Sequence, residues 1–482
     1  MNESIRPPAS PRPSAGILYL PVEVSVRELE SRLLLAAVAC EAGMEVVLGQ
    51  KWLLQKNIPQ MPPGVLLFKT LTNRDALAMR EAHAHGYLTA AIDEEAPGID
   101  PRTGGLRWVS ADALAQSDVI FALGEDHRDA LAEKYPQHAA KLEIVGNPRW
   151  DLLRPEFRAA HAGEAAAIRK EFGPFILINT NFGVTNSAKG PPEAVVRALV
   201  RGGKLDMNKP DDANLINESR RVEVLLMAEI GGLLRRLHDA FPGHRIVVRP
   251  HPNEVLDTWR KIIGDLPRVA LERRGAAIPW ILASDVLIHP YCTTGVEAFA
   301  LDKPAICFKP TETPLYDIYL SSSINFLAHD VEELVTEVAR IVSQSPGAFK
   351  YPQALRDRFD HAFAAHHGLL SAELIVRRLA ILAASAGARP WEPAAGFQRW
   401  MWLKHHKDAL MPRIAPEQLL EKLQRLQTQL HREQNFAITQ MGDRLFHIAA
   451  AVGENSIDDR SGAPPLWLRA HPRYTEAARA AH

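Results

Sequence analysis

Residue types that can hold a phosphate gather at the end of an apolar segment in the second half of the chain. The run SDVLIHPYCTTGVEAFALDKPAICFK reads as strand, loop, helix, turn and strand. Residues 293–295 would open the helix, where free N–H groups and a partial positive charge favour an anion. His289 precedes them, and Glu297 follows on the first helical turn, where it can face hydroxyl groups of a ligand. The pattern favours a phosphate-binding turn, although a purely structural βαβ unit with a threonine cap would look the same.

A second motif of this kind follows the apolar strand expected at Ile246–Val248. The next residues are RPHPNE, and their two prolines stiffen the turn because each fixes its own φ and restricts the residue before it. The turn would present the planar fork of one arginine and the compact donor of one histidine to a phosphate. Together the two loops indicate a nucleotide site. The residues expected to bind the donor nucleotide are Arg249, His251, Pro252, His289, Thr293, Thr294, Gly295 and Glu297.

Three consecutive acids, Asp93, Glu94 and Glu95, follow the strand expected at Tyr87–Ile92. Crowded carboxylates repel one another, which raises the pKa of at least one of them. A carboxyl group with a raised pKa can act as a general base, and an ionised one as a nucleophile. We therefore take the three acids as candidate catalytic residues, with an exposed acidic turn as the alternative.

Amides and hydroxyls follow the strand expected at Phe175–Asn179, in the segment NTNFGVTN. These groups suit contacts with a sugar or a phosphate, although Asn and Gly are also ordinary turn residues. The segment GNPRWD at 146–151 would end the first domain and form a hinge. The residues expected to bind substrate are Asn179, Asn181, Asn186 and Arg149.

The elements that must position these residues alternate along the chain. Short apolar strands follow amphipathic helices, which predicts an α/β protein whose parallel sheets are covered on both faces. We expect two doubly wound, Rossmann-like domains at 16–155 and 156–385, a disordered N-terminus at 1–15 and a helical tail at 386–482. The polar stretch 191–217 is long for a loop in a compact domain.

The tail has a composition of its own. Tryptophan is mixed with Lys, Arg and His from Trp391 to Arg413, and leucines recur along 416–446, which we expect to be one long helix. Three interpretations are open for that helix: it packs on its own domain, it joins two copies of the chain, or it lies at a membrane surface. We expect the tail to lie outside the catalytic core and to contact a membrane or a partner.

Composition narrows the class of protein. The chain has 482 residues and a net charge of −1, which does not favour nucleic acid or acidic lipid as a partner. The three cysteines are too few and too scattered for a disulfide framework, which suits a reducing cytosol. Cys292 lies beside the phosphate loop but lacks a His-plus-acid pattern that would activate it. No metal-ligand spacing, signal peptide or transmembrane run is apparent, and we expect a cytoplasmic protein without a metal or cofactor.

Several segments together resemble one bacterial family, the surface carbohydrate biosynthesis proteins. These segments are LYLPVEVSVRELESRLLLAAVACEAGMEVVLG, AIDEE, VGNPRWDLL, LINTNFG, RPHPNE and HPYCTTGVEAFALDKPAICF, and they fall within residues 16–330. The resemblance implies a GT-B glycosyltransferase that uses a nucleotide-sugar. It also implies a capsule or O-antigen glycan as product, and a lipid-linked or oligosaccharide acceptor at the inner face of the membrane.

A more distant similarity, to bacterial sialyltransferases and Kdo transferases, implies a CMP-activated donor. By that similarity His251-Pro252 would be the HP motif that binds the CMP phosphate, and Thr293 with Thr294 the hydroxyl motif. The acidic cluster would supply the catalytic carboxylate. GT-B enzymes with a G-x-E-A helix often place its glutamate on the nucleotide ribose, which implies that role for Glu297.

This chain departs from the sialyltransferase pattern, because Ala96 and Pro97 separate the acids from Gly98. The acting carboxylate and the stereochemical outcome therefore stay open. Three other functions are compatible with the fold: a non-hydrolysing UDP-sugar 2-epimerase, a CDP-glycerol-type polyol-phosphate transferase, and an inactive GT-B subunit that scaffolds a polysaccharide complex. The intact acidic cluster and HP motif argue against the last.

Overall fold

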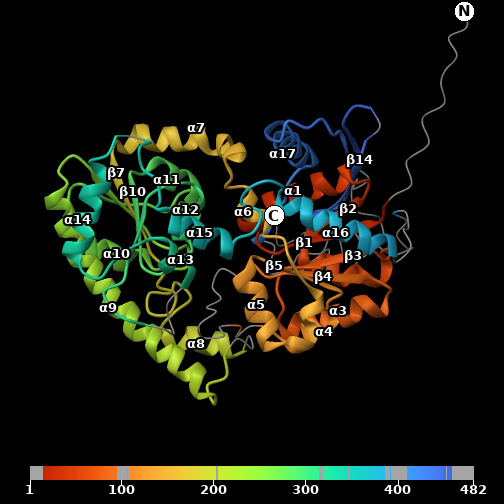
Figure 1. Cartoon of the computed structure of the whole chain (residues 1–482), viewed down its shortest axis with the longest axis horizontal. Coiled ribbons are helices and arrows are strands. Elements are labelled where there is room, and N and C mark those ends of the chain that lie inside the picture. Colours follow the sequence, from red (N-terminus) through yellow and green to blue (C-terminus); the bar gives the residue numbers. More distant parts are fainter. Residues whose placement is uncertain are drawn as a thin grey trace, which may run out of the picture. The chain divides into compact units, whose positions relative to one another are not determined.

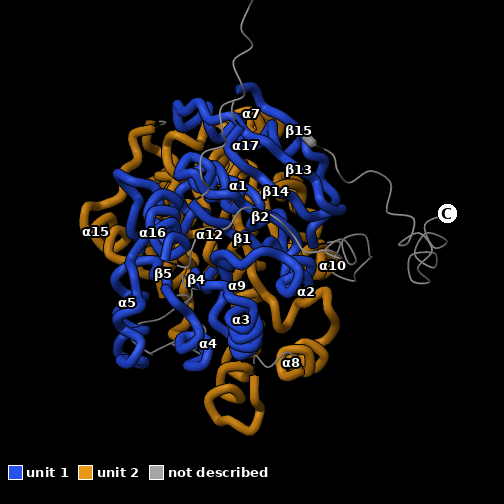
Figure 2. Tube along the Cα trace, turned by 90° about the vertical axis from the view of Figure 1, so that its right-hand side faces the viewer, with its two compact units in different colours: residues 1–94, 107–152, 363–482 blue, residues 95–106, 153–362 orange. Residues whose placement is uncertain are grey.

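The computed structural model describes residues 15–94, 106, 109–201, 205–313, 319–345, 347–385, 391, 410–451 and 453–458. These residues form two compact units, coloured separately in Figure 2. Unit 1 comprises the described parts of Met1–Glu94, Arg107–Leu152 and Phe363–His482, and unit 2 those of Glu95–Leu106 and Leu153–Ala362. Figure 1 shows a sheet with surrounding helices in each unit. The predicted α/β class with two doubly wound, Rossmann-like sheets is confirmed.

Unit 1 is built on a sheet of nine described strands in the order β15-β13-β14-β2-β1-β3-β4-β5-β6. Six of these strands run parallel, and most of their residues are buried, as expected for a sheet covered on both faces. They are β1 (Ile17–Val22), β2 (Glu45–Gln50), β3 (Val65–Phe68), β4 (Leu88–Ile92), β5 (Val119–Ala122) and β6 (Leu142–Ile144). The strand order reverses between β1 and β3, so their carboxyl ends flank the point where doubly wound folds bind ligands.

In unit 1, helix α1 (Ser25–Glu41) packs against strands β1 and β2 and against three described helices, and its segment Leu33–Cys40 is buried all round. A helix that is apolar on every face must lie inside the protein. The other helices are α2 (Lys51–Asn57), α3 (Asn73–Ala84), α4 (Ala111–Gln116), α5 (Glu125–Lys134), α6 (Pro148–Asp151), α16 (Ser371–Ser385) and α17 (Pro416–Gln429), with 3-10 turns at Ile58–Gln60 and Pro136–Lys141. Both α16 and α17 pack against α1.

The tail corrects the prediction of one long helix over 416–446. Helix α17 ends at Gln429, and the chain continues as β13 (Phe436–Gly442), β14 (Leu445–Ala450) and β15 (Ser456–Asp458). Strand β14 pairs antiparallel with β2, so the tail extends the sheet of unit 1. The physical reason is a period of two, because the buried Phe436 and Ile438 flank the less buried Ala437, and the buried Phe446 and Ile448 flank the less buried His447. Of the three interpretations, packing on its own unit describes α17.

Unit 2 is built on a sheet of six described parallel strands in the order β12-β11-β10-β7-β8-β9. They are β7 (Phe175–Asn179), β8 (Arg245–Arg249), β9 (Val269–Leu271), β10 (Val286–His289), β11 (Ala305–Phe308) and β12 (Phe326–Ala328). The helices are α7 (Pro155–Phe172), α8 (Pro192–Arg201), α9 (Pro210–Ala240), α10 (Leu256–Ile263), α11 (Ala277–Ala283), α12 (Thr294–Ala300), α13 (Tyr319–Ile324), α14 (Val331–Val342) and α15 (Gln353–Ala362). The order reverses between β7 and β10.

Two segments differ from the sequence-based organisation. The stretch expected to be a polar loop, 191–217, contains α8 and the start of α9, because Pro192 and Pro210 stand at favourable first positions of helices. Residues 363–385 group with unit 1, although the sequence-based boundary assigned them to the second domain. Asp151 explains this grouping, since its carboxylate accepts hydrogen bonds from the backbone N–H groups of Ser371 and Ala372 at the start of α16.

No described helix combines the length and the apolar character that are needed to cross a membrane.

Candidate functional site

Three loops of unit 2 leave the carboxyl ends of neighbouring strands. They follow β10, β7 and β8, which lie side by side in the sheet and run in the same direction. The strand order reverses between β10 and β7, which is where doubly wound folds bind nucleotides. The two predicted phosphate motifs and the asparagine segment therefore lie at one edge of one sheet.

Glu254, which the sequence analysis did not select, is the polar centre of this edge. Its carboxylate is fully buried. It accepts hydrogen bonds from four described donors: Thr180 Oγ1 at 2.7 Å, His251 N and Trp259 Nε1 at 2.9 Å each, and Asn186 Nδ2 at 3.3 Å. These bonds join the loop after β7, the loop after β8 and helix α10. The signal in the sequence was present, because Glu254 is the last residue of the RPHPNE motif.

His251 presents its ring to solvent above this centre, and Pro252 beside it is also exposed. The ring's Nδ1 accepts a hydrogen bond of 3.1 Å from the backbone N–H of Asn253. A neutral histidine with an accepting Nδ1 carries its proton on Nε2, which makes Nε2 a donor. The structure therefore gives His251 the exposure and the polarity that a phosphate contact requires.

Arg249 does not have the orientation that the sequence analysis expected. Its guanidinium lies 4.6 Å from the ring centre of Trp280. It donates to two carbonyl oxygens, that of Arg274 at 2.7 Å and that of Gly275 at 3.1 Å. Burial lowers the pKa of Arg249 to about 10, so the group remains charged at neutral pH. In this structure Arg249 braces the loop after β9, and the predicted phosphate fork is occupied by protein groups.

His289 also differs from its predicted role, because it is fully buried at the end of β10. Its Nδ1 accepts a hydrogen bond from the backbone N–H of Cys292 at 3.3 Å. Burial lowers the pKa of His289 to about 3, which keeps the ring neutral. Gly295 packs directly on this ring, since a Cβ there would lie 2.2 Å from His289 Nε2. Both residues shape the turn from inside, and burial also raises the pKa of the Cys292 thiol, which opposes a role as nucleophile.

The other predicted ligand contacts of this turn are Thr293, Thr294, whose hydroxyl oxygen is buried without a hydrogen-bond partner among the described residues, and Glu297. Thr293 is exposed, while the other two are half-buried on the first turn of α12. The side chain of Thr293 makes no capping hydrogen bond, so the predicted threonine cap is not formed. Tyr291 has a φ of 49°, a left-handed conformation that is uncommon for a residue with a side chain. Such strain is frequent at binding sites.

The asparagine segment divides into residues that hold the loop and one residue with unused capacity. Asn186 donates its amide to Glu254 and to the carbonyl oxygen of Val255, so its side chain is structural. Asn179 is buried, and its Oδ1 has no hydrogen-bond partner among the described residues. Asn181 is half-buried. A buried carbonyl oxygen without a partner is costly, so Asn179 is suited to accept a hydrogen bond from a ligand.

A second buried acid holds the same loop from the other side. Glu223 on α9 is buried, and its carboxylate accepts from the backbone N–H groups of Val184 and Thr185 and from the Thr185 hydroxyl, at 2.6 to 3.2 Å. Two buried carboxylates therefore hold the loop after β7. Glu254 binds Thr180 and Asn186, and Glu223 binds the backbone at Val184 and Thr185. Few loops need this degree of restraint for folding alone, and such rigidity suits the preorganisation of a binding site.

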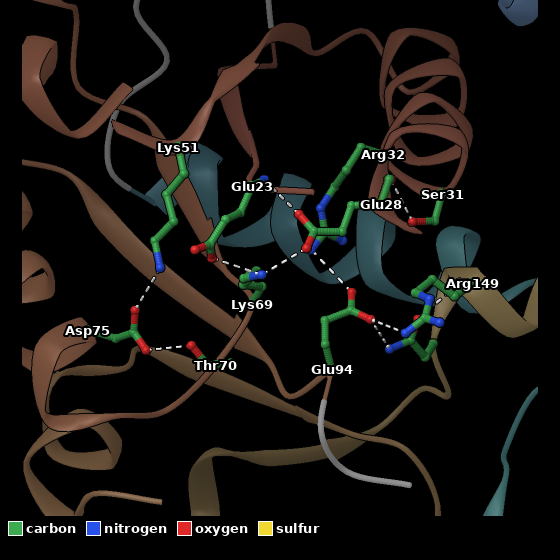
Figure 3. A network of polar contacts seen from close by, with 11 residues as sticks. Glu23, Glu28, Ser31, Arg32, Lys51, Lys69, Thr70, Asp75, Glu94 and Arg149 are labelled. Atoms are coloured by element: carbon green, nitrogen blue, oxygen red, sulfur yellow. Dashed lines mark hydrogen bonds and ion pairs between the residues drawn. The ribbon is translucent and has the colours of Figure 1, made fainter. Parts of the chain in front are cut away.

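In unit 1, Glu94 lies at the carboxyl end of β4 and is held by cations (Figure 3). Its carboxylate lies 3.2 Å from Arg32 Nη2, 3.3 Å from Arg149 Nη1 and 3.4 Å from Asn147 Nδ2. Burial acts to raise the pKa of Glu94, but the two arginines and the hydrogen bonds outweigh it and hold the pKa below its ordinary value. Glu94 is therefore not an acid of the cluster with a raised pKa, and it stays ionised. The cause is that its neighbours are arginines.

The other predicted residues of the acidic cluster are Asp93 and Glu95. Asp93 is buried at the end of β4, while Glu95 lies outside the described residues. Beside them, Lys69 follows β3 and pairs with Glu28 at 2.7 Å and with Glu23 at 2.9 Å (Figure 3). Burial acts to lower the pKa of Lys69, but these two acids outweigh it and raise the pKa.

Arg32 is a residue of this network that the sequence analysis missed. Its side chain is 1% exposed, and its Nε and Nη1 have no hydrogen-bond partner among the described residues. The signal was a charged pair, Glu28 and Arg32, one turn apart at the start of the apolar helix α1. Among the described residues no group of three or more His, Cys, Asp or Glu is placed to hold a metal ion.

Comparison with known proteins found no matching family model and no matching curated protein. Similar folds occur among solved structures. A UDP-N-acetylglucosamine 2-epimerase matches with 12% identity and a TM-score of 0.48, over 80% of this chain and all of that chain. The UDP-GlcNAc 2-epimerase of Neisseria meningitidis, bound to UDP-GlcNAc, matches with 15% identity and a TM-score of 0.39, over 75% and 84% of the two chains. The wall teichoic acid polymerase TagF matches with 11% identity and a TM-score of 0.41, over 77% and 89%. Likeness at this level assigns no activity or substrate to this chain.

Proposed function

We propose that this protein is a glycosyltransferase of bacterial surface polysaccharide synthesis that uses a nucleotide-activated sugar. The observation that carries the proposal is the edge of unit 2, where the loops after β7, β8 and β10 meet. There the exposed His251 stands on a loop that the buried carboxylate of Glu254 holds, and the exposed Thr293 stands on the loop after β10. The loop after β7 is held by the buried carboxylates of Glu254 and Glu223. The motifs that resemble the surface carbohydrate biosynthesis family lie on these same loops.

In this proposal unit 2 binds the donor, and CMP is the leaving nucleotide. His251 Nε2 donates to the phosphate, with the hydroxyls of Thr293 and Thr294 beside it. Glu297 accepts from the ribose hydroxyls, and Asn179 Oδ1 from another donor group of the ligand. Arg249 contributes by bracing the loop after β9, because its N–H groups are engaged by carbonyl oxygens. The groups proposed to contact the phosphate include no lysine or arginine, so hydrogen bonds rather than ion pairs carry most of the phosphate binding.

Unit 1 is proposed to bind the acceptor and to supply the catalytic carboxylate. An acceptor hydroxyl attacks the anomeric carbon of the donor sugar, and the bond from that carbon to the nucleotide phosphate breaks. The phosphate leaves with the bonding electrons, and a carboxylate takes the proton of the hydroxyl. Glu94 is poorly suited to take this proton, because two arginines lower its pKa and make it a weak base. Proton transfer therefore falls to Asp93 or Glu95, and Glu94 and Arg149 orient the acceptor.

The acceptor in this proposal is a lipid-linked or nascent glycan at the inner face of the membrane. The net charge of −1 does not attract the whole protein to an anionic bilayer, so contact must be local. The basic, tryptophan-containing stretch from Trp391 to Arg413 is the part of the tail proposed to make it. This division gives the tail two tasks, since its strands complete the sheet of unit 1.

A panel of nucleotides tests the proposal. A ligand that binds only the folded protein raises its melting temperature, because it stabilises the fold by RT ln(1 + c/Kd), where c is the concentration of free ligand. We expect CMP to raise the melting temperature at concentrations where UDP, CDP and GDP do not. A preference for UDP would favour the 2-epimerase, and a preference for CDP the polyol-phosphate transferase. No shift with any nucleotide would contradict the proposal and favour the scaffold subunit.

A further inference from the structure

The four hydrogen bonds to Glu254 are divided evenly between its two oxygens. Oε1 accepts from the hydroxyl of Thr180 and from the backbone N–H of His251. Oε2 accepts from the side chains of Asn186 and Trp259. An ionised carboxylate offers about four lone-pair positions and no proton, so these described donors use its whole capacity. No other group of similar size could accept four bonds in this arrangement.

Each donor fixes a different piece of the site. Thr180 directly follows Asn179, the residue with the unused acceptor. The backbone of His251 carries the exposed imidazole. Trp259 anchors α10, and its ring stacks on that of Phe182 in the loop after β7, with 5.8 Å between the ring centres. Backbone bonds join the outer parts of the same loops, from Ala188 N to Asn253 O and from Val255 N to Asn186 O. Nearer the strands, a backbone bond of 3.3 Å runs from Thr180 N to Arg249 O. Glu254 adds the side-chain link between Thr180 and the backbone of His251, next to the predicted ligand contacts.

We infer that Glu254 is a positioning residue, whose carboxylate sets Asn179 and His251 at one fixed separation so that a single nucleotide can contact both. The inference rests on the proposed function, and Glu254 would affect nucleotide binding only through the residues that it positions. Glu254 is fully buried and all its oxygens are occupied by protein donors, so it does not touch the ligand itself. Without it the backbone bond from Thr180 N to Arg249 O would remain. The turn that carries His251 would, however, lose its side-chain link to the loop after β7.

A matched pair of substitutions separates this role from general stability. Thr180→Val keeps the shape of the side chain and removes the hydroxyl that binds Oε1, whereas Thr180→Ser keeps the hydroxyl. We expect Thr180→Val to weaken CMP binding about tenfold in calorimetry, and Thr180→Ser to retain near-normal affinity. Thr336→Val is the control, since the exposed Thr336 hydroxyl donates to the carbonyl oxygen of Glu332 within helix α14 of the same unit. It should leave affinity unchanged.

Hydrogen exchange of the unliganded protein gives a second readout that needs no nucleotide. Thr180→Val and Glu254→Gln should both accelerate amide exchange in 180–188 and 251–255, while β7 and β8 keep their protection. Glu254→Gln places an NH2 group against two donors, so it should be the more severe of the two. Loss of protection across all of unit 2 would mean a folding defect and would overturn a specific positioning role.

The outcomes distinguish this inference from the proposed function. If loop exchange is unchanged in both variants, or if it rises while CMP affinity stays normal, Glu254 does not position the site. If the wild-type protein binds none of the four nucleotides, the proposed function fails. In that case exchange alone decides whether Glu254 couples the two loops.

Discussion

His251 is the side chain whose loss should affect the nucleotide most directly. Its ring is exposed and its accepting Nδ1 leaves Nε2 to donate. Replacement by alanine should weaken CMP binding by about 1–3 kcal/mol, the scale for losing a charge-assisted hydrogen bond, while the melting temperature of the unliganded protein hardly changes. Calorimetry and a thermal scan measure the two. Equal affinity in variant and wild type would remove His251 from the site.

Asn179 should behave differently, because its buried Oδ1 already lacks a partner in the unliganded protein. Asn179→Asp places an ionisable carboxyl at the same position without changing shape. An anionic ligand should then bind at least tenfold more weakly above the pKa of the new carboxyl, and the loss should shrink as pH falls and the group is protonated. Affinity that is independent of pH in this variant would place the ligand elsewhere.

Glu94 predicts an acid-sensitive contribution to the stability of unit 1. The pKa of Glu94 in the folded protein lies below the ordinary value of 4.5, so its ion pairs contribute in full at pH values above 4.5. The contribution is lost as pH falls from 4.5 through the lower folded pKa. Arg32→Met should cost about 3 kcal/mol at pH 7 and reduce this pH dependence. Urea unfolding at pH 7 and pH 4 measures both, and an unchanged pH dependence would contradict the ion-pair account.

These residues show where sequence reasoning reaches its limit. The RPHP and TTG motifs were found because proline stiffens a turn, and histidine and threonine after a strand offer hydrogen-bond donors to a phosphate. Arg249 and His289 were assigned to a ligand, yet one is stacked on Trp280 and the other is buried, since motif letters do not give side-chain direction. Glu254 and Arg32 were missed because their partners come from loops far apart in the sequence.

At the scale of elements, the strands were predicted well and the tail was not. Buried parallel strands are short apolar runs between turns, and such runs are visible in any sequence. Strands β13 and β14 are short and follow a helix with regularly spaced leucines, and the helical prediction was extended over them. Their place beside β2 depends on pairing across about 400 residues, which no local pattern encodes.

The pairing of β14 with β2 makes the tail necessary for unit 1. Phe446 is fully buried, and Phe446→Ala should cost about 3–5 kcal/mol of unfolding free energy. Truncation after Ser385 should expose the edge of β2 and give an aggregating or unfolded unit 1. Leu410→Ser, at an exposed position, is the control and should be neutral. A truncated protein with normal unfolding would show that the added strands are dispensable.

At the scale of the whole molecule, the two units should lose different functions on mutation. Asp93 and Glu94 belong to unit 1, while the cluster's last acid, Glu95, is the first residue of a segment grouped with unit 2. The nucleotide loops follow β7, β8 and β10 of unit 2, away from this cluster in the sequence, so neutralising the acting carboxylate should spare donor binding. We expect Asp93→Asn or Glu95→Gln to lower turnover about a hundredfold or more with CMP affinity intact. Turnover with the cognate donor and calorimetry with CMP measure the pair. Near-normal turnover in Asp93→Asn, in Glu95→Gln and also in Glu94→Gln would show that the cluster is only a structural turn.

The route of the chain through the two units has a consequence for biosynthesis. Residues 153–362 of unit 2 are one continuous stretch, whereas unit 1 draws on both the first and the last hundred residues of the described chain. As the chain leaves the ribosome, unit 2 can fold while the edge of β2 is still unpaired, because Leu445–Ala450 has yet to be made. During that interval the nascent protein carries an open sheet edge that can pair with another chain. Unit 1 is therefore completed only after Leu445–Ala450 has been made, and a chain that stalls or ends before that point would keep the open edge.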